Sequence, residues 1–177
     1  MQHVLWDRHI RLALSATVQV MPRCVMLDSL GRNAPELHKL FFRQLPLMLT
    51  EFMRFQWLIV DVKASNFGFH GAEHTLVLVD MESVVQYQGD GSSIPKPWIH
   101  TPGYSAPECC TNDEAPVTLK SDVYAFGKLC REMSAYLDGT QRETLAVIIT
   151  AATQEIPAQR PDMNAFIQML ADFSASV

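Results

Sequence analysis

The sequence predicts a mainly helical domain with one small β-hairpin, and three observations point to that fold class. Apolar residues recur every three or four positions over residues 37–53, two short strand-like runs flank a turn at Gly71, and helical segments with capping residues fill the part after position 120. A chain of 177 residues with 48% hydrophobic content can bury about 70% of its unfolded surface, so it can form a real core.

Residues 1–34 are expected to form a helix and a loop that lead into the main domain, which spans residues 35–177. The apolar spacing of residues 6–14 predicts a helix over residues 4–21. Glycine, asparagine and proline in residues 28–35 predict the loop that follows this helix.

A long helix is expected at the start of the main domain. Its apolar residues repeat at spacings of three and four, and Pro46 lies inside the pattern, where it predicts a kink. These apolar residues are Leu37, Leu40, Phe41, Leu45, Met48, Leu49, Phe52 and Met53. The helix would lie under the loop that comes next in the chain.

A hairpin is expected after that loop. Residues 65–69 and 75–80 have the composition of two short strands, and the turn between them includes Gly71. The residues that follow, 81–106, are rich in glycine, serine and proline. Such a composition predicts an exposed segment with little regular structure.

Three more helices are expected in the last third of the chain. Their predicted ranges are 121–137, 141–153 and 162–173. Asp162 has the position and the side chain of an N-cap for the last of them. The helices and the hairpin together give the predicted architecture of the main domain.

The residues with the clearest chemistry lie between the long helix and the hairpin. Residues 61–66 read Asp-Val-Lys-Ala-Ser-Asn, and a strand-like run later in the chain is followed directly by Asp80. A phosphoryl-transfer site needs one carboxylate near the acceptor hydroxyl, and an amide with a second carboxylate to hold Mg²⁺. Asp61, Asn66 and Asp80 supply these groups, because Mg²⁺ prefers hard oxygen ligands.

Three more motifs follow in order, and together with residues 61–66 they carry a family resemblance. They are Thr-Pro-Gly-Tyr-Ser-Ala-Pro-Glu at 101–108, Asp-Val-Tyr-Ala-Phe-Gly at 122–127, and Arg160-Pro161. With these motifs, residues 35–173 resemble the C-terminal lobe of a eukaryotic protein kinase. The resemblance implies the mainly helical fold of that lobe and phosphotransfer from ATP to a hydroxyl group.

The resemblance also implies a role for each matched residue. Asp61 would accept the hydroxyl proton, and Lys63 would contact the transferred phosphate of ATP. Asn66 and Asp80 would bind Mg²⁺. Without the resemblance, Lys63 can also be interpreted as a residue that only neutralises Asp61.

Three matched residues are expected to support the site without touching the substrate. In the family, the Glu of the Ala-Pro-Glu motif pairs with the Arg of the later Arg-Pro dipeptide, which here implies an ion pair between Glu108 and Arg160. Asp122 would anchor the backbone of the catalytic loop from the start of a central helix.

The chain departs from the family pattern in three places. Ile59 and Val60 stand where His-Arg usually precede the catalytic Asp, so regulation through a phosphorylated activation loop is not expected. Asp-Met-Glu at 80–82 replaces Asp-Phe-Gly, which keeps the metal-binding carboxylate but adds a charge beside it. No glycine-rich phosphate loop and no Val-Ala-Ile-Lys strand precede Asp61, so the N-terminal lobe is absent and the chain is expected to be a fragment or a truncated product.

Within the kinase interpretation, three functions stay open. Lys63 and the Thr-Pro-Gly-Tyr run at 101–104 favour a serine/threonine protein kinase. A pseudokinase scaffold would bind a partner without productive use of ATP, and Glu82 favours it. A small-molecule kinase would not need the segment with Pro107 and Glu108. The expected partners are ATP and either a protein substrate or a binding partner.

Composition narrows the partners and the compartment. The net charge of −5 and the lack of a Lys/Arg cluster argue against nucleic acid as the main partner. No apolar run reaches the roughly 18 residues of a membrane span, and the N-terminus does not read as a signal peptide. The four cysteines show no metal-ligand spacing, so reduced thiols in a cytoplasmic domain are expected. A secretory location stays open if an upstream region is missing.

Overall fold

The computed structural model describes residues 9–11, 17–19, 23–30, 34–93, 101–111 and 116–177. Its helices are α1 (Pro35–Arg54), α2 (Pro107–Thr111), α3 (Leu119–Met133), α4 (Gly139–Ala152) and α5 (Met163–Ser174). Its strands are β1 (His9–Arg11), β2 (Thr17–Gln19), β3 (Cys24–Met26), β4 (Trp57–Leu58), β5 (Phe67–His70), β6 (Thr75–Leu78), β7 (Val85–Gln86), β8 (Ser92–Ser93) and β9 (Val117–Thr118). The mainly helical class with small antiparallel sheets is confirmed.

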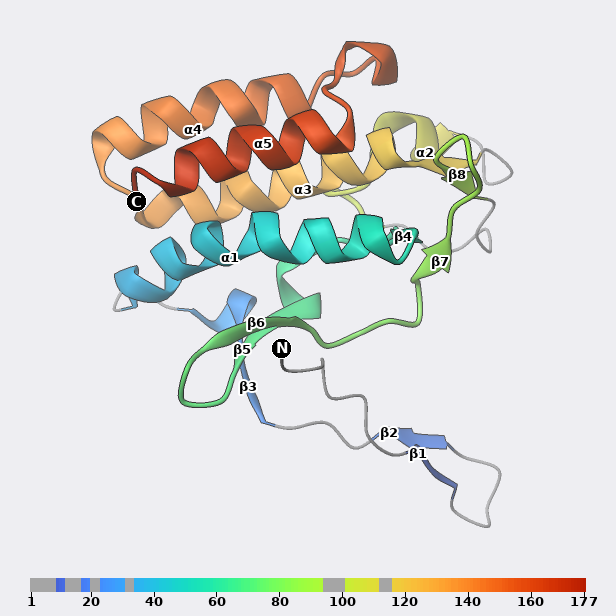
Figure 1. The fold of residues 1–177 in the computed structure, drawn as a ribbon, viewed down its shortest axis with the longest axis horizontal. Coiled ribbons are helices and arrows are strands. Elements are labelled where there is room, and N and C mark those ends of the chain that lie inside the picture. The colour runs from blue at the N-terminus through green and yellow to red at the C-terminus, as the bar shows by residue number, and fades with distance from the viewer. Residues whose placement is uncertain (1–8, 12–16, 20–22, 31–33, 94–100, 112–115) are drawn as a thin grey trace.

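The four longest helices form the body of the molecule (Figure 1). α3, α4 and α5 pack against one another, and α1 packs against α5. The sheet of β3, β5 and β6 lies along α1, with β6 in contact with that helix. The apolar faces of these elements meet in one core, whose largest fully buried side chains include Phe41, Phe42, Phe67, Phe69, Phe126 and Phe166.

α1 is the long helix that the apolar spacing predicts. It begins with Pro35. Proline is suited to this position because the N–H groups of the first turn have no partner within the helix, so the N–H that proline lacks is not needed. The chain stays helical through Pro46, and the hydroxyl of Thr50 donates a hydrogen bond to the Pro46 carbonyl at 2.8 Å. The buried face carries Phe41, Phe42, Leu45 and Leu49. Burial of each of these side chains stabilises the fold by roughly 1.5–3 kcal/mol. The end of α1, where the following loop begins, is therefore held in place by the core.

The predicted hairpin is confirmed as β5 and β6. The strands pair antiparallel from Phe67 opposite Leu78 to His70 opposite Thr75. Gly71 lies in the turn with φ +73°, a conformation that glycine adopts without steric cost. A third strand, β3, pairs with the other edge of β5 and was not predicted, because three residues are too few to show an alternating pattern.

The helix predicted over residues 4–21 is wrong where the structure describes that range. β1 and β2 form an antiparallel pair there, with Ile10 opposite Val18. The backbone pairing between the two strands outweighs the helical spacing of the apolar residues. Residues 4–8, 12–16 and 20–21 of the predicted helix lie outside the described residues, as do residues 31–33 of the predicted loop.

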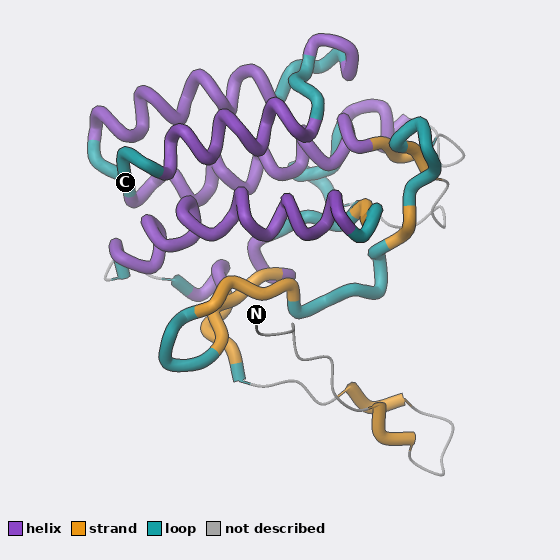
Figure 2. Tube along the Cα trace, viewed as in Figure 1, coloured by secondary structure: helices purple, strands orange, loops and turns teal. Residues whose placement is uncertain are grey.

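The three C-terminal helices are confirmed, each with a side-chain cap. The hydroxyl of Thr118 accepts from the Ser121 amide at the start of α3, and the carboxylate of Asp138 accepts from the Gln141 amide at the start of α4. Asp162 caps α5, as predicted. Figure 2 shows these helices as long purple coils joined by short teal loops. The caps explain why the predicted boundaries lie within a few residues of the observed ones.

The segment 81–106 is tied to the body by two short strands. β7 pairs with β4, and β8 pairs with β9 just before α3. Residues 94–100 of this segment lie outside the described residues. In the part of the chain that the structure describes, no helix has the length and apolar character needed to cross a membrane.

Candidate functional site

The loop between β4 and β5 carries the catalytic residues that the sequence predicts. It leaves β4 at Leu58 and ends in a 3₁₀ turn, Ala64–Asn66. Val60 has φ +65°, and the Asp61 amide donates to the Ile59 carbonyl at 2.7 Å. This hydrogen bond closes a γ-turn with positive φ, which is rare and strained. Such backbone costs about 1–3 kcal/mol and persists only where surrounding contacts hold it.

Asp122 supplies those contacts from the first turn of α3. Its Oδ2 accepts from the Ile59 amide at 2.7 Å and its Oδ1 from the Val60 amide at 3.1 Å. Asp122 is only 2% exposed. The hydroxyl of Ser83 adds a bond to the Ile59 carbonyl at 2.8 Å. The polar groups of the strained turn are therefore satisfied by side chains from distant parts of the chain, as predicted for Asp122.

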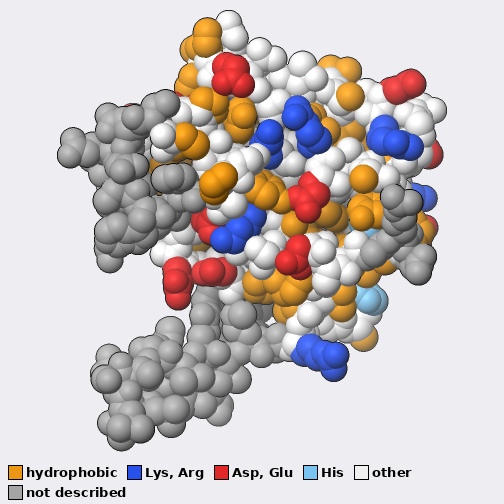
Figure 3. All heavy atoms as spheres, turned by 180° about the vertical axis from the view of Figure 1, so that it is seen from behind, with side chains coloured by type: hydrophobic (Ala, Val, Ile, Leu, Met, Phe, Trp, Pro, Cys, Tyr) orange, Lys and Arg blue, Asp and Glu red, His pale blue; other side chains and the backbone are white. Residues whose placement is uncertain are grey.

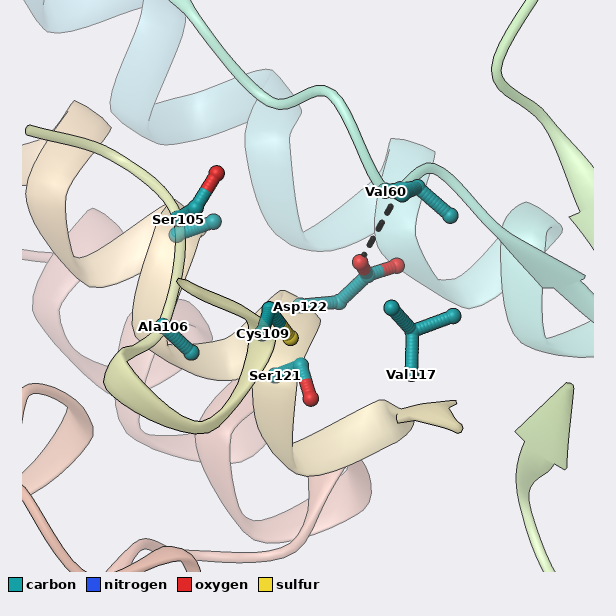
Figure 4. A pocket seen from close by; sticks show the side chains of 8 residues that line it. Val60, Ser105, Ala106, Cys109, Val117, Ser121 and Asp122 are labelled. Atoms are coloured by element: carbon teal, nitrogen blue, oxygen red, sulfur yellow. Dashed lines mark hydrogen bonds between the residues drawn. The ribbon is translucent and has the colours of Figure 1, made fainter. Parts of the chain in front are cut away.

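Burial dominates the electrostatics of Asp122. It raises the pKa of the carboxyl to about 6, and the two amide hydrogen bonds oppose this only in part. A cavity of about 10 Å³, close to the size of one water molecule, lies beside the carboxyl group. In Figure 4 the side chains of Cys109 and Ser121 lie close to Asp122, and the dashed line marks the bond between its carboxylate and Val60. The cavity is too small for a substrate.

Asp61 is the centre of a cluster of hydrogen bonds. The Lys63 ammonium lies 2.6 Å from Oδ2, and the Asn66 amide nitrogen lies 3.2 Å from the same oxygen. Asn66 also donates to the Asp61 carbonyl at 2.8 Å. The hydroxyl of Thr101 donates to Oδ1 at 2.5 Å. The structure thus brings together Asp61, Lys63 and Asn66, and adds Thr101 from forty positions along the chain.

The cluster keeps Asp61 ionised. Burial alone would raise the pKa of this carboxyl, but the hydrogen bonds from Lys63, Thr101 and Asn66 and the charge of Lys63 outweigh it and hold the pKa below its ordinary value. An ionised carboxylate can accept a proton late in a reaction if a hydroxyl is placed against it. The side chain of Asp61 is 15% exposed, so it can be reached from outside.

The hairpin pairs the residue before Asp80 with Asn66. The amide of Val79 donates to the Asn66 carbonyl at 2.8 Å, and Asp80 is the next residue. One carboxylate oxygen of Asp80 accepts from the backbone amide of Glu82 at 3.0 Å. Across the described ranges, no three His, Cys, Asp or Glu side chains are grouped so that they could hold a metal ion. An Mg²⁺ site here would depend on the amide oxygen of Asn66 together with Asp80.

Glu108 and Arg160 form the ion pair that the motifs imply. Arg160 donates to both Glu108 oxygens, at 2.7 and 2.8 Å, and its side chain has no exposed surface. Its guanidinium lies 4.8 Å from the ring centre of Tyr124. Burial would raise the pKa of Glu108, but the bonds and charge of Arg160 hold it below its ordinary value. The pair joins α2 to the turn before α5.

Three contributors to the site were missed by the sequence analysis. Thr101 and Tyr104 belong to the 101–108 motif but were not predicted to contact the loop, and no residue pattern pointed to Ser83. The hydroxyl of Tyr104 accepts from the Ala64 amide at 3.4 Å and donates to Glu132 of α3. These contacts join residues about 20 to 40 positions apart, and local sequence carries no signal for them.

The surface around the body has mixed charge. On the face drawn in Figure 3, blue basic and red acidic side chains are interspersed among apolar ones, and neither sign forms a continuous patch. A basic stripe of the kind that follows a nucleic-acid backbone is not visible on that face. No protein-family model matches this chain, and no curated protein matches it, so the case for a function rests on the geometry of the site.

Proposed function

We propose that this chain carries the catalytic loop of a protein-kinase-type phosphotransferase, which moves the γ-phosphoryl group of ATP to a serine or threonine hydroxyl. The single observation that carries the proposal is the cluster around Asp61. A partly accessible carboxylate of lowered pKa lies against a lysine, an asparagine and a threonine hydroxyl. The Thr101 hydroxyl shows that an aliphatic alcohol can approach Oδ1 to hydrogen-bond distance.

In the proposed reaction Asp61 orients the substrate hydroxyl and receives its proton. The hydroxyl oxygen forms a bond to the γ-phosphorus as the bond to the bridging β-γ oxygen breaks, and ADP leaves with that electron pair. The role of Asp61 depends mainly on position, because proton transfer comes late in this type of reaction. The Val60 turn and Asp122 supply that position, since they set the direction in which Asp61 leaves the backbone.

Lys63 and Asn66 have complementary roles in this proposal. In the structure the Lys63 ammonium bonds to Asp61. In the proposed reaction it also bonds to the transferred phosphate, or bonds to the phosphate instead, because the negative charge of the phosphate attracts it. In both hydrogen bonds that the Asn66 side chain makes among the described residues, its nitrogen is the donor, which leaves its oxygen for a metal. That oxygen and the carboxylate of Asp80 fit the hard-ligand preference of Mg²⁺. Bound Mg²⁺ would supply charge neutralisation at the phosphates.

A second candidate is a pseudokinase scaffold, and one observation favours it. Asp80 accepts from the amide of Glu82 in a tight local turn, so one of its oxygens is already engaged. The Glu82 carboxylate adds negative charge to the same turn. In this alternative the lobe binds a partner protein and does not use ATP productively.

The test is transfer of labelled phosphate from ATP, with Mg²⁺, to a mixture of serine- and threonine-containing protein substrates. Asp61→Asn should lower the rate by roughly 10²–10⁴-fold, because the proton acceptor is lost. Asp172→Asn is a matched control, since Asp172 lies on α5 and bonds only to Gln168 among the described residues. It should leave the rate unchanged.

Three outcomes would contradict the proposal of phosphotransfer to a protein hydroxyl. Equal transfer by the Asp61→Asn variant and the wild type would mean that Asp61 is not the catalytic group. If the wild type gives neither transfer nor an increase in melting temperature with Mg²⁺ and ATP, the scaffold candidate is favoured. Transfer to a metabolite but to no protein would favour a small-molecule kinase.

A further inference from the structure

His38 is a fully buried histidine in the first turn of α1. Its ring lies against the ring of Tyr136, with the two centroids 3.7 Å apart. Tyr136 ends η3 (Ser134–Tyr136), the 3₁₀ turn that follows α3. Figure 1 shows the start of α1 and the end of α3 at the same end of the helical body. The imidazole of His38 is therefore part of the contact between α1 and η3.

The two nitrogens of the His38 ring have different surroundings. Nδ1 lies 2.9 Å from the carbonyl oxygen of Ala34, and because a carbonyl can only accept, Nδ1 carries the proton of the neutral ring. Nε2 is buried and has no hydrogen-bond partner among the described residues. A second proton on the ring would place a positive charge and a new N–H donor where no described group accepts them, which is costly.

The charges on α1 and on the elements packed against it do not favour a protonated ring. β4, β6 and η3 carry no charged side chain, and α5 carries only Asp172, which accepts from another side chain of α5. On α1 itself, Glu36 lies 3.8 Å from the ammonium of Lys39, and Arg43 bonds to a backbone carbonyl. The first turn of a helix also carries partial positive charge, which disfavours a cation.

The charged groups next to η3 are also bonded elsewhere. Glu132 of α3 is bonded to the Tyr104 hydroxyl, and Asp138 accepts from the amide that it caps in α4. Arg131 and Arg142 are cations and would repel an imidazolium. None of the ion pairs formed by the described residues includes His38. Burial therefore lowers the pKa of His38 below its ordinary value of 6.5.

We propose that His38 is a pH-sensitive latch: the neutral imidazole holds the start of α1 against Tyr136 of η3, and its protonation in mildly acidic solution releases that contact. An opened or unfolded His38 binds a proton more readily than the packed one. The contact is therefore complete above about pH 6.5 and is lost as the pH falls below that value. The latch does not depend on the proposed phosphotransfer.

The first test follows the ring of His38 directly. In wild-type protein with ¹³C-labelled histidine, the Cε1–H signal of His38 is recorded by NMR from pH 8 to pH 4.5 and is identified by its loss in His38→Leu. The titration midpoint should lie below 6.5, the ordinary value. A midpoint at 6.5 or above would overturn the inference. If the leucine variant does not fold, the signal can be identified by its through-space contacts to the ring of Tyr136 in the wild type.

The second test compares the melting temperatures of wild type and His38→Leu between pH 7.5 and pH 5. Leucine keeps an apolar side chain in the core and cannot titrate, and all other groups cancel in the difference. The wild type should fall relative to the variant, by roughly 3–5 °C for each tenfold difference in proton affinity between the unfolded and folded states. His74→Asn is the matched control, because asparagine tolerates the positive φ of 50° in the hairpin turn. It should keep the pH dependence of the wild type, and a parallel dependence in His38→Leu would overturn the latch.

The third test locates the opening. The amide of Leu137 donates to the Ser134 carbonyl within η3, so its hydrogen exchange reports on this turn. After correction for the intrinsic effect of pH, exchange at Leu137 in the wild type should be up to about 30-fold faster at pH 5 than at pH 7.5, since the opened imidazole titrates at its ordinary pKa. Acceleration spread evenly over all helices, or none at Leu137, would overturn a local latch.

Discussion

Val60 shows how a single residue can set the geometry of this site. A β-branched residue rarely has positive φ, yet here it has φ +65° between a strand and Asp61. The strain is tolerated because the buried carboxylate of Asp122 accepts from the amide of Val60 and from that of the residue before it. Asp122 is therefore the residue at which the stability of the loop should depend on pH.

The free energy of unfolding should report the ionisation of Asp122. Its pKa is raised from 3.8 to about 6 in the folded protein, so the folded state holds the proton more tightly than the unfolded state. The stability that this proton contributes is complete below about pH 4 and is lost as the pH rises through 6. The loss corresponds to about 3 kcal/mol.

Urea unfolding of the wild type and of Asp122→Asn, at a series of pH values, checks this prediction. The variant cannot titrate at this position, and other groups cancel in the difference between the two proteins. The stability of the wild type relative to the variant should fall between pH 4 and about pH 6.5 and then stay constant. A difference that does not change with pH would show that Asp122 has an ordinary pKa.

At the scale of elements, the contact between α3 and α4 depends on one glycine. A Cβ on Gly127 would lie 2.8 Å from the Cβ of Ala152 and 2.9 Å from Cγ2 of Thr153. These distances are shorter than van der Waals contact, and Ala152 is itself fully buried. The two helices can pack this closely only because position 127 has no side chain.

Gly127→Ala should therefore destabilise the protein, although alanine favours a helix by about 1 kcal/mol. Overpacking costs about 1–3 kcal/mol, so a net loss of up to about 2 kcal/mol is expected, measured by urea unfolding. Gly139→Ala is the matched control, because nothing lies within 4 Å of a Cβ at that position in the first turn of α4. It should be neutral or slightly stabilising. Equal effects of the two substitutions would contradict the close packing.

At the scale of the whole molecule, Glu108 and Arg160 join two parts of the chain that lie 52 positions apart. Arg160 is 2% exposed, and it also donates to the carbonyls of Gln154, Lys120 and Glu155. The carbonyls satisfy its N–H groups but do not neutralise its charge. Loss of Glu108 would leave a buried cation without an anionic partner, which is costly.

Glu108→Gln should lower the free energy of unfolding by about 3 kcal/mol at pH 7, the lower end of the range for a broken buried pair. The lower end applies because the side chain of Glu108 is 26% exposed. Because the folded pKa of Glu108 is lowered, the advantage of the wild type should shrink as the pH falls below about 4.5. The variant for comparison is Glu36→Gln, which breaks the ion pair between Glu36 and Lys39 on the surface, where Glu36 is 80% exposed. A similar small change in both variants would contradict the prediction.

The sequence by itself determined the helical frame of this protein. α1 follows from apolar spacing, because a helix is specified by residues three and four positions apart, and α5 follows from its Asp162 cap. The hairpin follows from two short runs around Gly71. The contact between Asp61 and Asn66 could also be predicted from the sequence, because the two residues are only five positions apart.

Only the tertiary structure decided how Asp61 is held. The positive φ of Val60 is contrary to the preference of its side chain, and the hydroxyls of Thr101 and Tyr104 reach the loop from about 40 positions away. The pair of β1 and β2 likewise replaced a predicted helix. In each case contacts between distant segments, or between strands, outweighed the local preference, and a pattern of near neighbours in the chain cannot record such contacts.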